Sequence, residues 1–324
     1  MKVGIIVPSY ARWWRGQAMW DTLEQAKKAG VDSLHFVDHI IFTPAQYVGY
    51  GNGYMDMWTT MSYVAAVTNI QRWNPTLAQS VCVIPYRPPI QQAKIAATVD
   101  SLSGGRLQIG AGTGYNEQEF AALGLNVHER GSMTDEYLKC MIELWTHPVA
   151  SFHGKYANFD EMTISVRPIQ QPIPILVGAT GKRPFRRVAE FCHGWVPGPG
   201  QGAEGLKRIE EGWSEISALW KEYGRQGEPY LCVSPKRAHL VPPRSRASEA
   251  VSKGVTREGE RAYVAAYPMT RPAELVKEIR SYESIGAKEY VVFPPTYRFG
   301  EWDNKATFMN QLELLGEHVI PKVK

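Results

Sequence analysis

Residues 83–120 read VIPYRPPIQQAKIAATVDSLSGGRLQIGAGTGYNEQEF, a stretch that holds a helix, a turn, a strand and a loop in that order. Apolar residues over 90–102 have the spacing of a helix, and the Gly-Gly pair that follows predicts the turn. Residues 106–110 predict a buried strand that leads directly into a glycine-rich run. This order is typical of α/β proteins, in which a helix connects each parallel strand to the next.

Outward from this unit, short apolar runs alternate with amphipathic segments along the whole chain. The predicted strands are 3–7, 33–37, 76–83, 106–110, 173–177, 194–197, 230–241 and 289–293. The predicted helical segments are 19–30, 56–68 with Asp56 as N-cap, 90–102, 117–123 with a stripe over 133–144, 185–192, 206–223, 275–282 and 308–315. Eight strand–helix units are the number that a closed (β/α)8 TIM barrel needs. An open doubly wound sheet remains the alternative, because periodicity does not show closure.

Two segments interrupt this alternation, near 43–55 and 242–268. The first is rich in Gly and Tyr, and the second in proline, basic and small residues. Neither has the composition of a linker, so we expect one α/β domain over 1–324 with two loop insertions. Long loops at the carboxyl ends of barrel strands are where substrate sites and lids are built.

Composition limits the classes of function. The 324 residues carry a formal net charge of +4 with scattered basic residues, which disfavours nucleic acid and membrane surfaces as partners. The four cysteines lie far apart with no C-x-x-C pair, so buried thiols in a reducing compartment are expected. The apolar run at the N-terminus is too short for a signal peptide, and no stretch reaches membrane-spanning length. We therefore expect a cytoplasmic protein.

Three motifs follow predicted strands and are candidate functional sites. Asp38 and His39 end the second strand, where a histidine can exchange a proton with a ligand, or serve as a structural hydrogen-bonding group. The run 110–114, Gly-Ala-Gly-Thr-Gly, can direct backbone N–H groups at an anion or a ring edge, or form only a tight turn. The run 178–183, Gly-Ala-Thr-Gly-Lys-Arg, suits a phosphate at a helix N-terminus, although its basic pair can equally be solvated surface.

Other chemistries have little support in the sequence. The histidines form no H-x-x-x-H or H-E-x-x-H pattern, which disfavours a metal, and no G-x-S-x-G motif is present. Ser80 and Val81 in the third strand carry no chemical signal of their own, and barrel core is their ordinary interpretation. Several aromatic residues predict an apolar or aromatic substrate pocket, with core packing as the alternative: Trp13, Trp14, Trp20, Tyr47, Tyr50, Tyr54 and Trp58.

Taken together, these segments resemble the luciferase-like family of flavin and deazaflavin oxidoreductases over nearly the whole chain. The matching stretches are VGIIVPSY, DSLHFVDH, the run 83–120 with ALGL after it, and PIPILVGATG with FCHGWVP. The central stretch is the most specific, because its helix, turn, strand and glycine loop come in the family's order and spacing. The resemblance implies a (β/α)8 barrel that holds FMN or coenzyme F420 without covalent attachment, and a homodimer.

The resemblance also implies roles for particular residues. The family's strand-two histidine falls on His39, as the catalytic acid or base, with Asp38 beside it. A strand-three bulge with a non-proline cis peptide, behind the cofactor's ring, falls on Ser80 and Val81. The loop beside the cofactor's ring and side chain, and a second loop that contacts its tail, fall on these residues: Gly112, Thr113, Gly114, Tyr115, Asn116, Gly178, Ala179, Thr180 and Gly181.

The loop sequence GTGYNEQEF resembles the deazaflavin branch more than the FMN branch. We therefore expect an F420-dependent oxidoreductase that transfers a hydride to or from a small organic substrate. An FMN-dependent monooxygenase is the alternative enzyme, and a cofactor-binding or storage protein the non-enzymatic alternative. Deazaflavin sugar-phosphate dehydrogenases of this family carry a proton-donating glutamate directly after G-T-G, where this chain has Tyr115, so that activity is not expected.

Overall fold

The computed structural model describes residues 1–9, 16–49, 54–198, 202–234, 239–242, 269–294 and 305–324. Of the predicted insertion near 242–268, residues 243–268 lie outside the described residues, as do Trp13, Trp14 and Tyr50. The other insertion contains a short helix, α2 (Pro44–Gly49).

Parallel strands form a closed barrel. Their order is β3-β2-β1-β13-β10-β9-β8-β5-β4, and β3 also pairs with β5, which closes the ring. The strands are β1 (Lys2–Ile6), β2 (Ser33–Phe36), β3 (Thr76–Gln79), β4 (Cys82–Val83), β5 (Leu107–Gly112), β8 (Ile175–Val177), β9 (Gly194–Trp195), β10 (Tyr230–Val233) and β13 (Glu289–Val292). β3 and β4 are two parts of one predicted strand, so the barrel has the eight strand positions expected, each called a stave below. The open-sheet alternative is therefore wrong.

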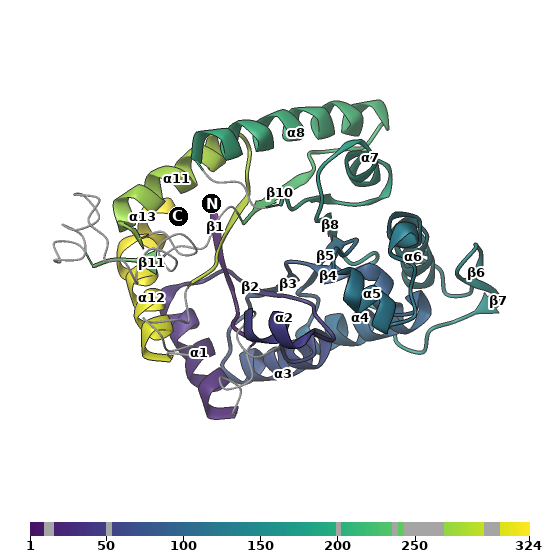
Figure 1. Ribbon diagram of the computed structural model, residues 1–324, viewed down its shortest axis with the longest axis horizontal. Helices are drawn as coiled ribbons and strands as arrows, with labels where there is room; N and C mark the ends of the chain where they lie inside the picture. Colours follow the sequence, from purple (N-terminus) through teal and green to yellow (C-terminus); the bar gives the residue numbers. More distant parts are fainter. Residues whose placement is uncertain (10–15, 50–53, 199–201, 235–238, 243–268, 295–304) are drawn as a thin grey trace.

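Helices surround the strands (Figure 1). They are α1 (Gly16–Ala29), α3 (Met57–Ile70), α4 (Pro89–Ser103), α6 (Arg130–Thr146), α7 (Lys182–Phe191), α8 (Gly202–Glu222), α11 (Pro272–Ser284) and α12 (Lys305–His318), with α13 (Ile320–Val323) at the end of the chain. As predicted, the Asp56 carboxylate caps α3 by accepting a hydrogen bond from the Thr59 N–H at 2.8 Å. A further short helix, α5 (Glu117–Ala122), follows β5 and lies at the site described below.

One predicted strand is corrected, and one hairpin was not predicted. The predicted strand 230–241 ends at Val233, and residues 239–240 (β11, His239–Leu240) pair instead with β12 (Met269–Thr270). An antiparallel hairpin, β6 (Ala150–His153) with β7 (Asn158–Met162), was not predicted, because its residues are mostly exposed and lack an apolar run. Trp58 is 3 % exposed and belongs to the main core, and partly buried Trp20 packs against it, which agrees with the core-packing alternative for these two residues.

The main apolar core fills the space between the strands and the surrounding helices. Within it, Trp145 of α6 is fully buried and donates from Nε1 to the Ala93 carbonyl of α4 at 3.0 Å. Among the described residues, no helix is both long and apolar enough to cross a lipid bilayer.

Candidate active site

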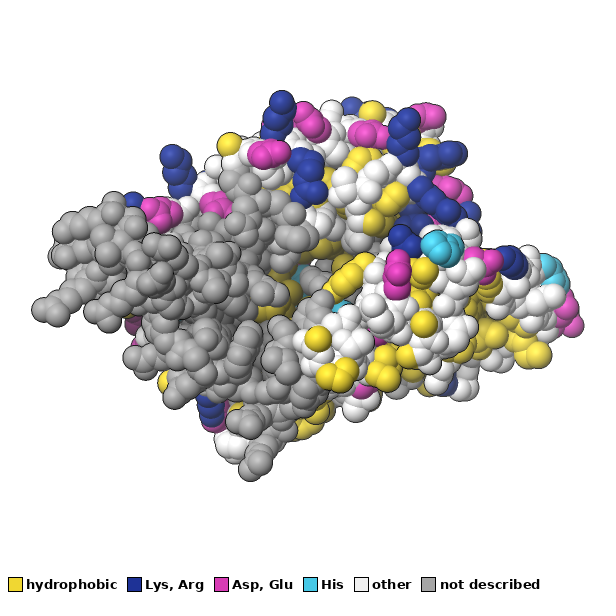
Figure 2. All heavy atoms as spheres, viewed as in Figure 1, with side chains coloured by type: hydrophobic (Ala, Val, Ile, Leu, Met, Phe, Trp, Pro, Cys, Tyr) yellow, Lys and Arg dark blue, Asp and Glu magenta, His cyan; other side chains and the backbone are white. Residues whose placement is uncertain are grey.

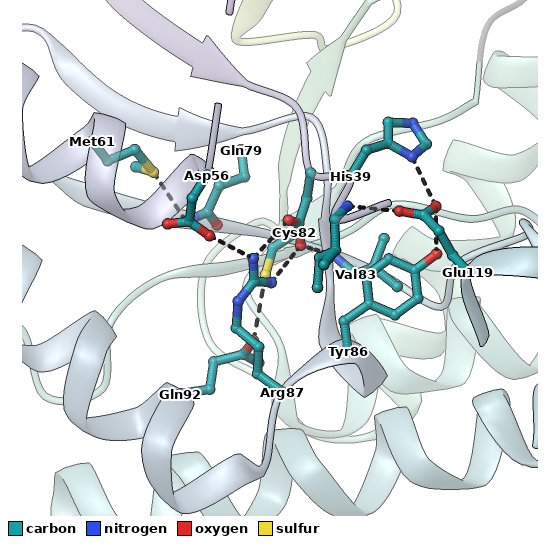
Figure 3. Close-up of polar contacts among 12 residues, drawn as sticks. His39, Asp56, Met61, Gln79, Cys82, Val83, Tyr86, Arg87, Gln92 and Glu119 are labelled. Carbon is teal, nitrogen blue, oxygen red and sulfur yellow. Dashed lines mark hydrogen bonds and ion pairs between the residues drawn. The ribbon is translucent and has the colours of Figure 1, made fainter. Parts of the chain in front are cut away.

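Asp38 lies just beyond the carboxyl end of β2, and its side chain makes structural contacts within the barrel. Its carboxylate is buried, accepts from the Val83 N–H at 3.0 Å, and forms two hydrogen bonds of 2.8 and 2.9 Å with Arg87. Arg87 also reaches Asp56 at 3.2 Å (Figure 3). Paired hydrogen bonds to a guanidinium fix both distance and orientation. The Asp38–Arg87 pair therefore ties the end of β2 to the chain that follows β4.

His39 points to the other side, toward the helix that follows the glycine loop (Figure 3). Its Nδ1 is 2.9 Å from Glu119 Oε2, and the carboxylate of Glu119 is fully buried. Glu119 Oε1 also accepts from the Ile40 N–H at 2.7 Å, and Oε2 accepts from the Tyr86 hydroxyl at 3.0 Å. Sequence analysis did not identify Glu119, although its place three residues after the Asn116 cap puts it on the inner side of α5.

The charge state of Glu119 fixes the proton arrangement on His39. Burial by itself would raise the pKa of Glu119, but hydrogen bonds from His39 and the Ile40 N–H, with the nearby histidine, hold that pKa below its ordinary value. An ionised carboxylate can only accept hydrogen bonds, so His39 Nδ1 must carry a proton. The other ring nitrogen, Nε2, then becomes the position at which His39 can take up or release a proton.

Aromatic rings surround His39. The Tyr54 ring stacks on the imidazole with centroids 5.6 Å apart, Phe42 is at 5.1 Å, and Tyr115 meets it edge-on at 6.1 Å. Tyr115 is 67 % exposed at the end of the glycine loop. The Tyr54 and Phe42 rings also lie 5.8 Å apart. An apolar or aromatic group can pack against such rings, whose faces and edges differ in charge.

Ser80 and Val81 interrupt the third stave between β3 and β4, and their peptide bond is cis, as the resemblance implies. Glycines leave the room that Val81 occupies. A Cβ on Gly112 would lie 2.3 Å from Val81 Cγ2, and one on Gly178 would lie 2.4 Å from Val81 Cγ1. Gly112 and Gly178 are therefore required because Val81 packs too closely to leave room for a Cβ at either position, and not because of their backbone φ angles.

The prediction that residues 110–114 form a loop after the strand is wrong in one respect. Gly110, Ala111 and Gly112 belong to β5, paired with β8 on one side and β4 on the other, so the loop begins only at Thr113. Gly114 has φ +79°, a conformation that favours glycine. The strand runs on because β8 and the interrupted third stave supply partners for its last residues.

Asn116 ends this loop and caps α5. Its Oδ1 accepts from the N–H groups of Gln118 and Glu119 at 3.2 and 3.4 Å. The side chain is almost fully buried, and its Nδ2 has no hydrogen-bond partner within the described part of the chain. A buried donor without an acceptor is costly, which makes it a position where a bound ligand can supply one.

The second loop leaves β8 beside the same glycines. The Gly178 N–H donates to the Ala111 carbonyl at 2.7 Å, and the Ala179 carbonyl accepts from Trp195 Nε1 at 2.6 Å. Thr180 is exposed, and Gly181 has φ +122° where α7 begins. The sequence motifs at 38–39, 80–81, 112–116 and 178–181 thus meet at the carboxyl ends of neighbouring strands, where TIM barrels carry their active sites.

A buried polar cluster inside the barrel contacts the Ser80 side chain, and it was not predicted from the sequence. His35 of β2 lies 2.8 Å from Glu289 of β13 through Nε2 and 2.9 Å from Ser80 Oγ through Nδ1. Glu289 also accepts from Ser33 and from the Tyr230 hydroxyl. Although burial opposes ionisation, these hydrogen bonds and the nearby histidine lower the pKa of Glu289 to about 2. No pattern joins residues 35 and 289 in the sequence, because barrel closure alone makes them neighbours.

The described residues form a parallel barrel with His39, the glycine loop and the interrupted third stave at one mouth, as the resemblance to the luciferase-like oxidoreductases implies. The family model for luciferase-like monooxygenases matches residues 8–292. The chain therefore belongs to this family of oxidoreductase enzymes.

Individual relatives differ in cofactor. An uncharacterised protein of Mycobacterium tuberculosis is 33 % identical over 178 residues, which are 55 % of this chain and 60 % of the relative. The F420-dependent tetrahydromethanopterin reductase of Methanopyrus kandleri superposes with a TM-score of 0.72 and 18 % identity over 100 % of this chain and 99 % of that one. The oxygenating part of the Pseudomonas putida 3,6-diketocamphane monooxygenase, in complex with FMN, gives 0.69 and 16 % over 100 % and 99 %. At these identities the two structures show the fold alone.

Proposed function

We propose that the protein is an F420-dependent oxidoreductase that transfers a hydride between the deazaflavin and a small apolar or aromatic substrate. One observation carries the proposal: the hydrogen bond between His39 and buried Glu119, at 2.9 Å, joins the strand-two histidine to the glycine-loop helix. The likeness of GTGYNEQEF to the deazaflavin branch favours F420 over FMN.

The residues at the mouth suit such a cofactor. The Asn116 Nδ2, which has no partner among the described residues, offers a buried donor. Because Gly112 and Gly178 have no side chains, Val81 can pack against them and form one side of the site for the cofactor's ring, called the ring seat below. The loop over 178–181, with the N-terminus of α7, suits the phosphate of the cofactor's side chain. When bound, F420 supplies a carbon centre that donates or accepts a hydride and hardly reacts with oxygen.

His39 would hold the proton that accompanies the hydride. Its Nδ1–H is fixed by Glu119, so Nε2 is the atom that would protonate, or take a proton from, the substrate's reacting oxygen or carbon. The neighbouring rings of Phe42, Tyr54 and Tyr115 would exclude water and hold an apolar substrate group. The family resemblance adds the expectation of a homodimer, which light scattering of the purified protein tests.

Replacement of His39 by Ala tests the role of this side chain. General acid–base catalysis contributes about 10²- to 10⁴-fold, so turnover should fall by that factor while the Kd for F420 changes less than about tenfold. His128, an exposed histidine outside the site, provides the matched control as His128→Ala. Turnover that survives in His39→Ala would show that the proposed role is wrong.

An FMN-dependent monooxygenase is the second candidate, favoured by the FMN-bound structure above. Fluorescence titration with F420 and with FMN, followed by oxygen-uptake assays with reduced FMN, separates the two. Tighter binding of FMN with substrate-dependent oxygen uptake would replace the F420 proposal. A storage role would give binding without oxidation of the reduced cofactor by any member of a substrate panel in single-turnover experiments.

A further inference from the structure

A basic groove lies between α6 and α7. Its volume is about 490 Å³. Lys and Arg side chains gather over these helices on the face shown in Figure 2. The basic residues that line the groove are Lys139, Lys182, Arg183, Arg186 and Arg187.

Two acidic residues also line the groove, and each is already paired. Asp135 accepts from Arg183 Nε at 2.7 Å and from Arg187 Nε at 2.5 Å, and Glu190 accepts from Lys139 at 2.9 Å. Five cations against two carboxylates leave an excess of three positive charges. The groove is therefore suited to an anion with more than one charged group.

Arg187 gives a second, independent indication of a ligand. Its side chain is 2 % exposed, and its Nη1 is buried without a hydrogen-bond partner among the residues that the structure describes. A buried guanidinium N–H that lacks an acceptor is unfavourable, and a carboxylate or phosphate oxygen is the acceptor that a guanidinium prefers. This unsatisfied donor belongs to a side chain that lines the groove.

The groove begins where the second cofactor loop ends. Gly178 packs against Val81 at the mouth of the barrel, and Lys182 is four residues further along the chain. Four residues span at most about 14 Å, so the basic residues start within that distance of the proposed ring seat. A molecule seated at the mouth can therefore extend a tail into the groove.

We propose that this groove binds the carboxylates of the oligoglutamate tail of F420, beyond its phosphate. The inference rests on the proposed function, because it takes the deazaflavin to be the cofactor. A free polycarboxylate has the same chemistry as the tail and is distinguished below. FMN ends at its phosphate, so on this inference the groove contributes to F420 binding alone.

The test compares F420 with its full tail, F420 stripped of its glutamates, and a tetra-γ-glutamate peptide, each titrated by fluorescence or calorimetry. The variant is Lys182→Glu/Arg186→Glu, which reverses two exposed charges and leaves buried Arg187 in place. The control is Lys207→Glu/Lys221→Glu, with the same charge change on exposed positions of α8. Circular dichroism checks that both variants fold.

The wild type and the control should bind tailed F420 about tenfold more tightly than stripped F420, whereas the groove variant should bind both forms within about twofold. High salt should remove the same difference in the wild type, because it screens exposed charges. Equal binding of both forms by the wild type would overturn the groove assignment and leave the F420 proposal standing. Binding of FMN but neither form of F420 would overturn both, and peptide binding lost in the groove variant would then assign the groove to a free polycarboxylate.

Discussion

Replacement of Glu119 by Gln tests whether the His39 proton arrangement depends on charge. The ionised carboxylate accepts from His39 Nδ1, the Ile40 N–H and the Tyr86 hydroxyl. A glutamine has one acceptor oxygen, so its NH2 group must face either the imidazole N–H or the backbone N–H. A hydrogen bond to a charged group contributes about 1.5–3 kcal/mol and a neutral one about 0.5–1.5 kcal/mol, a difference of about 1.5 kcal/mol.

That difference corresponds to about tenfold in rate, and the donor–donor contact increases it, so kcat should fall by about 10- to 100-fold. Steady-state kinetics measures this fall in kcat, and fluorescence titration should show an unchanged Kd for F420.

Two further variants make the result interpretable. Glu117→Gln changes an exposed carboxylate on the same helix and should behave as the wild type. Tyr86→Phe removes one donor to Glu119 and keeps its charge, so it should reduce kcat only a few-fold. If Glu119→Gln is folded and keeps more than half of the wild-type kcat, the carboxylate does not orient His39 and the reasoning fails.

Three predictions concern the barrel itself. Gly112→Ala places a Cβ against Val81, so it should destabilise the fold by about 1–3 kcal/mol in urea titrations and weaken cofactor binding; an unchanged midpoint would contradict the packing argument. Arg87→Lys loses the paired contact with Asp38 and should lower the free energy of unfolding by about 1–3 kcal/mol; an unchanged value would show that one ammonium hydrogen bond replaces the pair. Because the pKa of Glu289 is about 2 in the folded chain and near 4.5 when unfolded, its stabilising contribution is complete above about pH 4.5 and is lost as pH falls toward 2. Glu289→Gln should therefore show a shallower decline of stability over that range, and identical slopes would refute the assignment.

Local patterns predicted much of the fold. Apolar runs located all eight staves, and the Asp56 cap was predicted from residue type alone. The long strand over 230–241 was wrong because an apolar run does not show where its hydrogen-bonding partners end. Trp20 and Trp58 pack at the main core, one of the two alternatives, and the sequence could not separate them since an aromatic residue gives the same signal in a core as in a binding site.

For the candidate site too, some residues were predicted from the sequence and others were not. Motifs near strand ends identified Asp38, His39 and the two glycine-containing loops, because a motif and its strand are adjacent in the chain. Their partners were not predicted. Arg87 and Glu119, which pair with Asp38 and His39, are ordinary charged residues in the sequence, as is Glu289, which pairs with His35, and only their position beside a complementary group in the fold gives them a structural role.

The sequence by itself determined the order of the eight barrel strands and of the helices between them, and the Asp56 cap, because these depend on residues a few positions apart. Only the tertiary structure decided which side chains meet at the mouth. His39 and Glu119 are separated by 80 positions, and His35 and Glu289 by 254, and they become neighbours when parallel strands close into a ring. Hydrogen bonding and burial act through distance in space, which a local pattern does not specify.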